Sequence, residues 1–382
     1  MAGIYIHIPY CRQACHYCNF HFSVSRKTRH VFLKALLREI ELRKDFFDVS
    51  GKNKKASSVK TVYFGGGTPS ILPPETLVQV VRKLEEFFML DSVEEFTLEA
   101  NPDDLSPGYL ESLSQTPVDR LSIGIQSFHK ADLNYMNRGH SPAQAMESIE
   151  NAQKAGFENL SVDLIYGTPT LNDGTWVDNL NRVIAAGVPH VSAYALTVEP
   201  KTPLEFFIRK GRVQQVDEEQ LAGQFRLLQH LMRERGYLHY EVSNFALPGH
   251  LSRHNLAYWQ GIPYLGLGPS AHSYGKDQRS WNVANTSAYI ASINNNVLPQ
   301  SIEALTPEQK LNEYLMTSLR TMWGCDLDFV LTEWGGQRAE IILKQAEKFI
   351  SRGLMHQRES VLFLTDEGKL FADGIAADLF VE

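Results

Sequence analysis

The feature that narrows the fold most is an alternation of strand-like and helical segments over the first half of the chain. Each short run of β-branched and apolar residues is followed by a stretch whose apolar residues recur at helical spacing. Strands and helices that alternate in this way form a parallel sheet with right-handed crossovers. Six such units predict an α/β fold, a partial (β/α)6 barrel, whose active site lies at the carboxyl ends of the strands. The predicted strands are 4–8, 61–64, 95–99, 120–125, 160–164 and 190–196, and the first predicted helix is 28–47.

Beyond this alternation the sequence changes character twice. A region rich in Gly, Pro, Asn and aromatic residues comes first, and a helix-rich C-terminal part follows, which predicts a small winged-helix-like α+β domain. The predicted elements are helix 217–235, strand 239–242, helices 308–320 and 337–352, strand 361–364 and a last helix from 366. We therefore predict a core at 1–236, an extension at 237–296 and a C-terminal domain at 306–382, with a linker at 294–307.

The composition is that of an ordinary folded protein, with 43% hydrophobic and 21% charged residues in a chain of 382. No apolar run approaches the ~20 residues that a membrane helix requires. The N-terminal sequence lacks the basic region of a signal peptide, so we expect a cytoplasmic protein with at most peripheral membrane contact. The formal net charge of −7 argues against general nucleic-acid binding. The basic stretch 51–58 is predicted to be a solvated loop.

Three of the four cysteines, Cys11, Cys15 and Cys18, follow the first predicted strand directly. In a reducing compartment, thiols spaced so closely are more often metal ligands than disulfides. Soft thiolates select iron–sulfur clusters, Zn²⁺ or Cu(I). A structural zinc site requires a fourth protein ligand, whereas a four-iron cluster held by three cysteines keeps one iron open for chemistry. The simpler alternative for the three cysteines is that they are buried core thiols. For Cys325, a buried thiol is the simplest interpretation.

A second group of polar residues follows the predicted strands. Gly66, Gly67 and Thr68 lie in a Gly-Gly-Gly-Thr-Pro run, where glycines allow close backbone approach and expose N–H groups towards a ligand. Singly, each of the other residues is more simply a cap, a turn residue or a buried salt-bridge partner. Together they predict one polar site at the carboxyl edge of the sheet. These other residues are Glu99, Gln126, Arg138 and Asp163.

The cysteine spacing resembles that of the radical S-adenosylmethionine (SAM) superfamily, and the Gly-Gly-Gly-Thr-Pro run matches the superfamily motif that meets the amino-acid end of SAM. The resemblance implies a [4Fe–4S] cluster on the three cysteines, with SAM chelating the open iron. A reduced cluster of this kind splits SAM to a 5′-deoxyadenosyl radical. The SAM contacts that the resemblance implies are Tyr5, Tyr17, Gly66, Gly67, Thr68, Glu99, Gln126, Arg138 and Asp163.

Within this superfamily the chain resembles the oxygen-independent coproporphyrinogen III oxidase-like family over essentially its whole length. The dehydrogenases of that family have a further cysteine where this chain has Phe20, and a longer segment before the cysteines. A haem-chaperone branch instead carries an H-N-x-x-Y-W motif, which matches His254, Asn255, Tyr258 and Trp259. Imidazole and Tyr oxygen are both haem-iron ligands, and aromatic rings suit a porphyrin face. Without the resemblance, this segment is more simply an aromatic stretch packed on the core.

The resemblance therefore implies a haem chaperone that binds haem, the cluster and SAM and passes haem to an acceptor protein, with a homodimer allowed. The alternative is a coproporphyrinogen III dehydrogenase acting by radical oxidative decarboxylation. Radical modification of RNA is a third function, which the acidic balance disfavours. Because His254 is distant in sequence from the predicted SAM residues, we expect its substitution to leave SAM affinity nearly intact. His250 and Tyr258 are the next candidates for a haem ligand.

Overall fold

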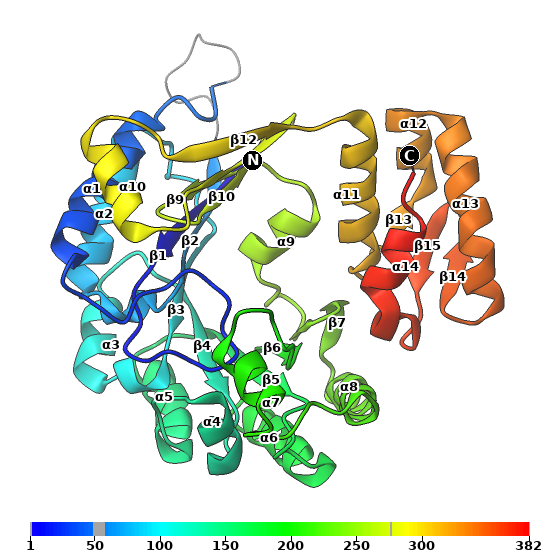
Figure 1. Ribbon diagram of the computed structural model, residues 1–382, viewed down its shortest axis with the longest axis horizontal. Coiled ribbons are helices and arrows are strands. Elements are labelled where there is room, and N and C mark those ends of the chain that lie inside the picture. Colours follow the sequence, from blue (N-terminus) through cyan, green and yellow to red (C-terminus); the bar gives the residue numbers. More distant parts are fainter. Residues whose placement is uncertain (1, 49–57, 276, 382) are drawn as a thin grey trace.

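The computed structural model describes residues 2–48, 58–275 and 277–381, so most of the predicted basic loop at 51–58 lies outside the described residues. Six consecutive parallel strands form the centre of one curved sheet, and each strand pairs with the next in sequence (Figure 1). The predicted parallel α/β fold is therefore confirmed. The six strands are β1 (Ala2–Ile8), β2 (Val59–Gly66), β3 (Glu95–Ala100), β4 (Arg120–Gln126), β5 (Asn159–Tyr166) and β6 (His190–Ala195).

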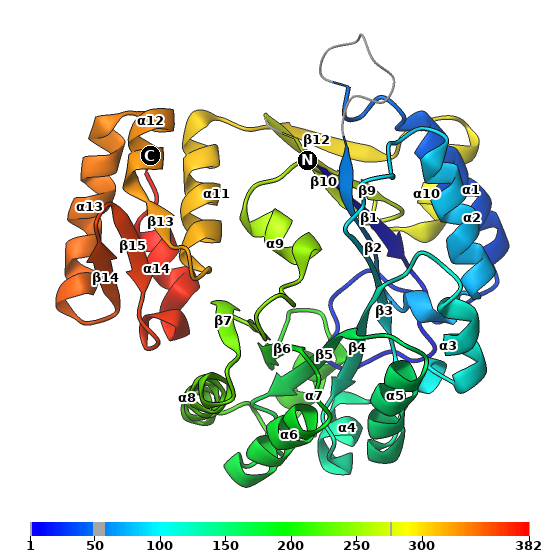
Figure 2. The ribbon, with the colours of Figure 1, turned by 180° about the vertical axis from the view of Figure 1, so that it is seen from behind.

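Helices cover the outer face of this sheet (Figures 1 and 2). The strands are nearly continuous apolar runs because both faces of the sheet are buried. Helices cover the outer face, and the curvature of the sheet encloses the inner face. The first helix ends at Leu42, five residues before its predicted end, and a series of turns follows. The helices of this region are α1 (Arg29–Leu42), α2 (Pro74–Glu85), α3 (Pro107–Leu113), α4 (Lys130–Met136), α5 (Pro142–Lys154) and α6 (Asp173–Ala185), with short 3-10 turns η1 (Pro69–Ile71) and η2 (Pro102–Asp104).

Residues of the predicted extension widen the sheet at both edges to twelve strands. At one edge, β9 (Tyr264–Leu267) pairs in parallel with β1, and three antiparallel strands continue outward: β10 (His272–Tyr274), β11 (Gln278–Asn282) and β12 (Gln300–Ala304). At the other edge, β8 (Asn244–Ala246) and β7 (Leu238–Glu241) are antiparallel to β6. The helices here are α7 (Pro203–Arg209), α8 (Glu218–Glu234), α9 (Arg253–Trp259) and α10 (Thr286–Asn294).

The predicted linker at 294–307 is wrong, because its residues 300–304 form β12, which pairs with β11 along its whole length. This strand lies at the outer edge of the sheet, and its central residue Ile302 is 58% exposed. An edge strand without a buried face carries little of the apolar alternation by which strands are recognised in sequence.

The C-terminal region has its own core and a three-stranded antiparallel sheet in the order β13-β15-β14. A helix, a strand, two helices and a hairpin follow one another in a winged-helix-like order. The sequence predicts helices followed by a hairpin, but not the short strand Cys325–Asp326 or the helix Leu327–Trp334. The elements are α11 (Pro307–Leu319), β13 (Cys325–Asp326), α12 (Leu327–Trp334), α13 (Gly336–Ser351), β14 (Met355–Arg358), β15 (Val361–Leu364), η3 (Gly368–Phe371) and α14 (Ala372–Asp378). In the part of the chain that the structure describes, no helix is both long and apolar enough to span a membrane.

Candidate functional site

The cysteine loop leaves the end of β1 and is fastened to elements distant in sequence. The Cys11 N–H donates to the Ser23 carbonyl at 3.0 Å, and the His16 N–H donates to the carbonyl of Met136, at the end of α4, at 3.0 Å. The Asn137 side chain, which caps α4 in a left-handed conformation, donates to the carbonyl of Ala14 at 2.7 Å. These bonds hold the loop open over the carboxyl ends of the strands.

The three thiols of this loop are half-buried and influence one another electrostatically. Burial, together with the charges of Cys18 and Cys15, raises the pKa of Cys11 to about 11. Arg138 Nη1 lies 3.3 Å from the Cys15 sulfur, so a cation faces the loop. Within the described residues no three His, Cys, Asp or Glu side chains converge on a position for a single metal ion. The donor set is three soft thiols with an arginine beside them, which fits an iron–sulfur cluster.

Arg138 joins the cysteine loop to the strand ends. Its Nη2 donates to Asn101 Oδ1 at 2.8 Å and to the Gly124 carbonyl at 2.5 Å, while its Nε is buried without a hydrogen-bond partner. Asn101 in turn donates to the Thr68 hydroxyl at 3.2 Å. Gln126 is the last residue of β4 and has a left-handed φ of 69°, and its side-chain oxygen is also buried and unpartnered. Orphaned polar atoms from the end of β4 and from the loop after α4 therefore lie close to each other, beside a residue that contacts Cys15, where a polar ligand could satisfy them.

Two carboxyl groups lie in the carboxyl-terminal halves of β3 and β5. Glu99 accepts hydrogen bonds from the Tyr63 hydroxyl at 2.8 Å and from the Gly66 N–H at 3.0 Å. Asp163 accepts one from the Ser122 hydroxyl at 3.1 Å. Burial, together with the charge of Asp163, raises the pKa of Glu99 to about 7, and burial also raises the pKa of Asp163 to about 6. Both groups change charge close to neutral pH, which is common at functional sites.

The glycine run allows close approach of the backbone, as the sequence predicts, but the N–H groups of Gly66 and Gly67 do not point to a ligand. The Gly66 N–H is occupied by Glu99, and the Gly67 N–H donates to the Ile8 carbonyl at 2.9 Å, so neither amide is free for a ligand. A Cβ on Gly66 would lie 2.6 Å from the His7 ring, and one on Gly67 would lie 2.8 Å from the Tyr10 carbonyl oxygen. Gly66 also has φ of +107°, which side chains rarely tolerate. The glycines allow the ends of β1 and β2 to pack closely.

The H-N-x-x-Y-W motif forms α9, which contacts both β2 and α11 and lies between the sheet and the C-terminal domain (Figures 1 and 2). His254 is 1% exposed, and both of its ring nitrogens are hydrogen-bonded: Nδ1 to the Thr61 hydroxyl at 2.8 Å and Nε2 to the Tyr258 hydroxyl at 2.7 Å. Burial lowers the pKa of His254 to about 3, so the ring is neutral. One of the two bonds must break before this imidazole can bind iron.

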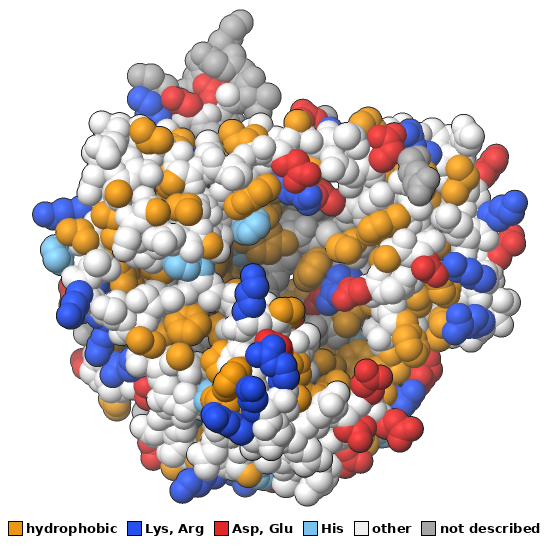
Figure 3. Space-filling view, in the orientation of Figure 1, with side chains coloured by type: hydrophobic (Ala, Val, Ile, Leu, Met, Phe, Trp, Pro, Cys, Tyr) orange, Lys and Arg blue, Asp and Glu red, His pale blue; other side chains and the backbone are white. Residues whose placement is uncertain are grey.

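The other motif residues of α9 differ in their surroundings. The Asn255 N–H donates to the Ser252 side chain, the N-cap of the helix. The Trp259 ring lies 5.3 Å from the guanidinium carbon of Arg320, and its Nε1 is buried without a partner. The Tyr258 ring packs edge-on against Tyr264 at 4.4 Å. Figure 3 shows the molecule hollowed between the sheet and the C-terminal domain, with hydrophobic side chains around the hollow.

The predicted SAM site and the predicted haem motif, which the sequence suggests are independent, are in contact. The Tyr63 ring stacks on the His254 ring with centroids 4.9 Å apart and planes at 25°, and the Tyr63 hydroxyl holds Glu99. The Tyr5 ring stacks on the Tyr63 ring, with the two centroids 6.0 Å apart. The expectation that His254 can change without affecting the strand-end site is therefore unsupported by the structure.

Sequence reasoning missed some residues of the site and placed others correctly outside it. Tyr63 was hidden in an apolar strand, and Asn101 follows β3 in a Pro-containing turn that carries no distinct motif. Tyr17 lies beside the thiols, where burial raises its pKa, and the neighbouring Phe20 is 68% exposed. Cys325 is fully buried in the core of the C-terminal domain, as its simplest interpretation predicts.

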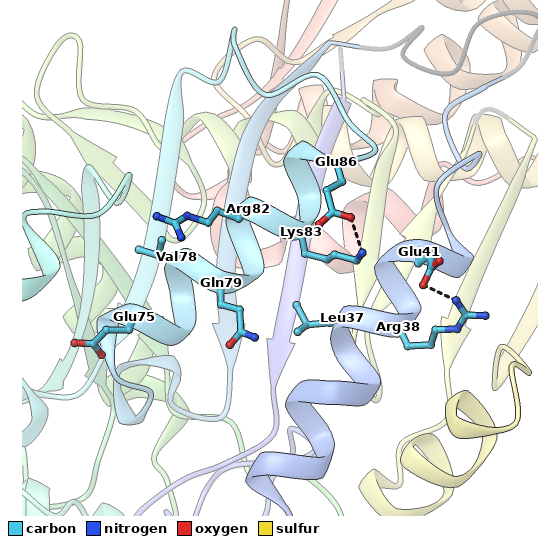
Figure 4. A pocket seen from close by; sticks show the side chains of 9 residues that line it. All are labelled: Leu37, Arg38, Glu41, Glu75, Val78, Gln79, Arg82, Lys83 and Glu86. Carbon is cyan, nitrogen blue, oxygen red and sulfur yellow. Dashed lines mark hydrogen bonds and ion pairs between the residues drawn. The ribbon is translucent and has the colours of Figure 1, made fainter.

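A separate groove lies on the outer face of the molecule between α1 and α2 (Figure 4). Four of its charged side chains form two ion pairs, Arg38 with Glu41 and Lys83 with Glu86. None of the sequence-predicted site residues lines it. The groove is on the helical side of the sheet and is no part of the candidate site.

The fold and the site define a radical SAM protein. A family model described as Radical SAM superfamily matches residues 5–183, and one described as HemN C-terminal domain matches residues 305–371. The solved structure of coproporphyrinogen III oxidase (HemN) from Escherichia coli, a radical SAM enzyme, superposes with a TM-score of 0.84 over 100% of this chain and 90% of that chain. The two sequences are 22% identical, so this likeness shows the fold alone.

Two relatives extend the comparison to sequence. One from Bacillus subtilis is 32% identical over 378 residues, covering 98% of each chain, and one from Mycobacterium tuberculosis is 34% identical over 382 residues, covering 99% of this chain and 94% of the relative. Both are named heme chaperone HemW. The chain belongs to the HemW family, which confirms the predicted family and its haem-chaperone branch.

Proposed function

We propose that the protein is a haem chaperone that binds haem, a [4Fe–4S] cluster and SAM and delivers haem to an acceptor protein in the cytoplasm. The observation that carries this proposal is the similarity over nearly the whole chain to relatives named heme chaperone HemW. The contact between the cysteine loop, the strand-end polar groups and α9 supports it, because one side of one sheet then offers all three ligand sites.

The residues present fit the implied cofactors. Cys11, Cys15 and Cys18 would hold the cluster, and the cluster, when bound and reduced, would supply an electron to the sulfonium of SAM. Arg138, with its unpartnered Nε, is placed to meet a carboxylate, since a guanidinium pairs well with that group. Glu99 and Asp163 offer acceptors for ribose hydroxyls. Tyr5 would contact the same ligand from β1.

The haem site would be built on α9, with His254 or Tyr258 as the iron ligand and Trp259 against the porphyrin face. In the described structure His254 is fully hydrogen-bonded, so haem binding includes a local rearrangement of the His254–Tyr258 bond. Hydrogen bonds of this kind contribute only about 0.5–1.5 kcal/mol net, so a strong iron–ligand bond can replace one.

This site predicts a loss of haem affinity in His254→Ala. We expect the affinity to fall by at least about 10-fold, the lower end of the cost of disturbing a ligand set, with a shift of the Soret band in a haem titration. His356→Ala, which changes an exposed His on β14, serves as the control and should bind haem normally. Normal binding by both His254→Ala and Tyr258→Phe would remove α9 as the haem site.

The specific rival is the coproporphyrinogen III dehydrogenase activity, because the strand-end groups that would bind SAM are all in place. We expect the purified protein to form no protoporphyrinogen IX from coproporphyrinogen III with SAM and a strong reductant under anaerobic conditions. Chromatography of the porphyrins after oxidation measures this directly. Sustained turnover would assign the protein to the enzymes instead.

The raised pKa values predict a pH-dependent affinity for SAM. Glu99 and Asp163, with pKa values near 7 and 6, lose their protons as the pH rises through those values, and the ionised carboxylates are the stronger acceptors for ribose hydroxyls. SAM affinity should therefore fall as the pH is lowered from 8 to 5.5 in calorimetric titrations. Glu99→Gln should flatten the upper part of this profile. The two groups interact, so the observed midpoints belong to the pair.

A further inference from the structure

One residue that no motif singles out, Tyr63 of β2, touches both proposed ligand sites. Its side chain is 8% exposed. The hydroxyl donates to Glu99 Oε1 at 2.8 Å, and the ring stacks on His254 at 4.9 Å. The other carboxylate oxygen of Glu99 accepts a hydrogen bond from the Gly66 N–H, so Tyr63 supplies one of the two bonds that fix the carboxylate.

The contacts that run from Glu99 through Tyr63 lead to His254 of the haem motif. His254 is held between Thr61 of β2 and Tyr258 of α9, at 2.8 and 2.7 Å. Because both nitrogens are in use, the imidazole cannot bind iron and keep both of these bonds. A movement of the ring changes the face on which Tyr63 stacks, and Tyr63 in turn orients Glu99.

We propose that Tyr63 couples the two ligand sites, so that haem binding on α9 and SAM binding at the strand ends change each other's affinity. This inference rests on the proposed function and adds its regulation. Tyr63 is a positioning residue here, since it acts through Glu99 on one side and through His254 on the other. The coupling must be reciprocal, because a free-energy coupling between two sites acts equally in both directions.

The first test needs no haem. SAM affinity is measured by calorimetry for the cluster-loaded wild type, Tyr63→Phe, His254→Ala and the double variant. Tyr63→Phe keeps the ring and removes the bond to Glu99, and His254→Ala removes the stacking partner. If the two residues act as one unit, the double variant should differ from the product of the single effects by about 2-fold or more. Multiplicative effects would overturn the proposed coupling.

The matched control is Tyr109→Phe. Tyr109 is likewise a tyrosine whose hydroxyl donates a hydrogen bond, in its case to the backbone carbonyl of Leu72 at 3.2 Å, but it lies on α3 away from both sites. Paired with His254→Ala in the same cycle, it should give effects that multiply. A non-multiplicative result with this control would mean that His254→Ala perturbs the whole fold.

The second test measures the coupling with both ligands. In the wild type, saturating haem should change the SAM dissociation constant by a factor in the range of about 5 to 150, and saturating SAM should change the haem constant by the same factor. In Tyr63→Phe that factor should fall towards 1. A wild type that binds both ligands with no mutual effect would overturn the inference and leave the proposed function intact. A wild type that binds no haem would refute the proposed function, and the haem-free cycle would still decide whether Tyr63 and His254 act together.

Discussion

Replacing Cys15 with Ser should abolish the visible absorption of the iron–sulfur cluster after anaerobic reconstitution. Three thiolates hold the proposed cluster, and the described residues offer no further cysteine nearby, because Cys325 is buried in the C-terminal core. A serine hydroxyl is a poor ligand for iron at neutral pH, since soft thiolates are what such clusters select. Iron and sulfide per protein should fall with the absorption band, from about four of each to near zero.

The control for this loss is Cys325→Ser, which removes a thiol from the other domain and should leave the iron content unchanged. Binding of a metal centre is coupled to local folding, so Cys15→Ser should also expose the segment between β1 and α1 to proteolysis. A Cys15→Ser protein that retained a complete cluster would show that the ligand set is different from the one proposed here.

The central sheet could be predicted because its signal is repeated. Each parallel strand is buried on both faces and therefore apolar, and each is followed by a helix of distinct period, as for β5 and α6. The position of Glu99 and Asp163 followed from the same pattern, since parallel strands bring their carboxyl ends to one edge. Polar residues directly after such strands are exceptions to the pattern and can be noticed in a single sequence.

The connection between the two sites could not be predicted. Thr61 and His254 are 193 residues apart, and they meet only because α9 packs on β2 where the chain passes from β8 at one edge of the sheet to β9 at the other. Tyr63 lies in an apolar strand, where an aromatic residue suggests core packing and no more. The glycine run illustrates a second limit. Glycine in a loop indicates close approach, but the sequence does not say whether the approaching group is a ligand or, as for Gly66, the His7 ring of the protein itself.

Arg138 is the residue whose loss should disturb the proposed SAM site most. It donates to Cys15, Asn101 and the Gly124 carbonyl, and its Nε has no partner in the protein. These three hydrogen bonds place the guanidinium between the cysteine loop and the ends of β3 and β4. The unpartnered Nε is the position from which it would meet a carboxylate. Arg138 would therefore both bind the ligand and hold the groups around it.

Replacing Arg138 with Ala should weaken SAM binding by roughly 10- to 150-fold, because a lost charge-assisted hydrogen bond costs roughly 1.5–3 kcal/mol. Arg138→Lys keeps the charge but not the planar fork, so it should recover only part of the affinity. Arg182→Ala is the matched control: Arg182 is 45% exposed in an ion pair with Asp178 on α6, and such surface pairs contribute little. Calorimetric titration of the reconstituted proteins with SAM measures all three. If Arg138→Ala binds SAM as tightly as the wild type while its iron content is normal, the carboxylate of SAM lies elsewhere, and the strand-end site must be reassigned around Gln126, whose side-chain oxygen is the neighbouring buried atom without a partner.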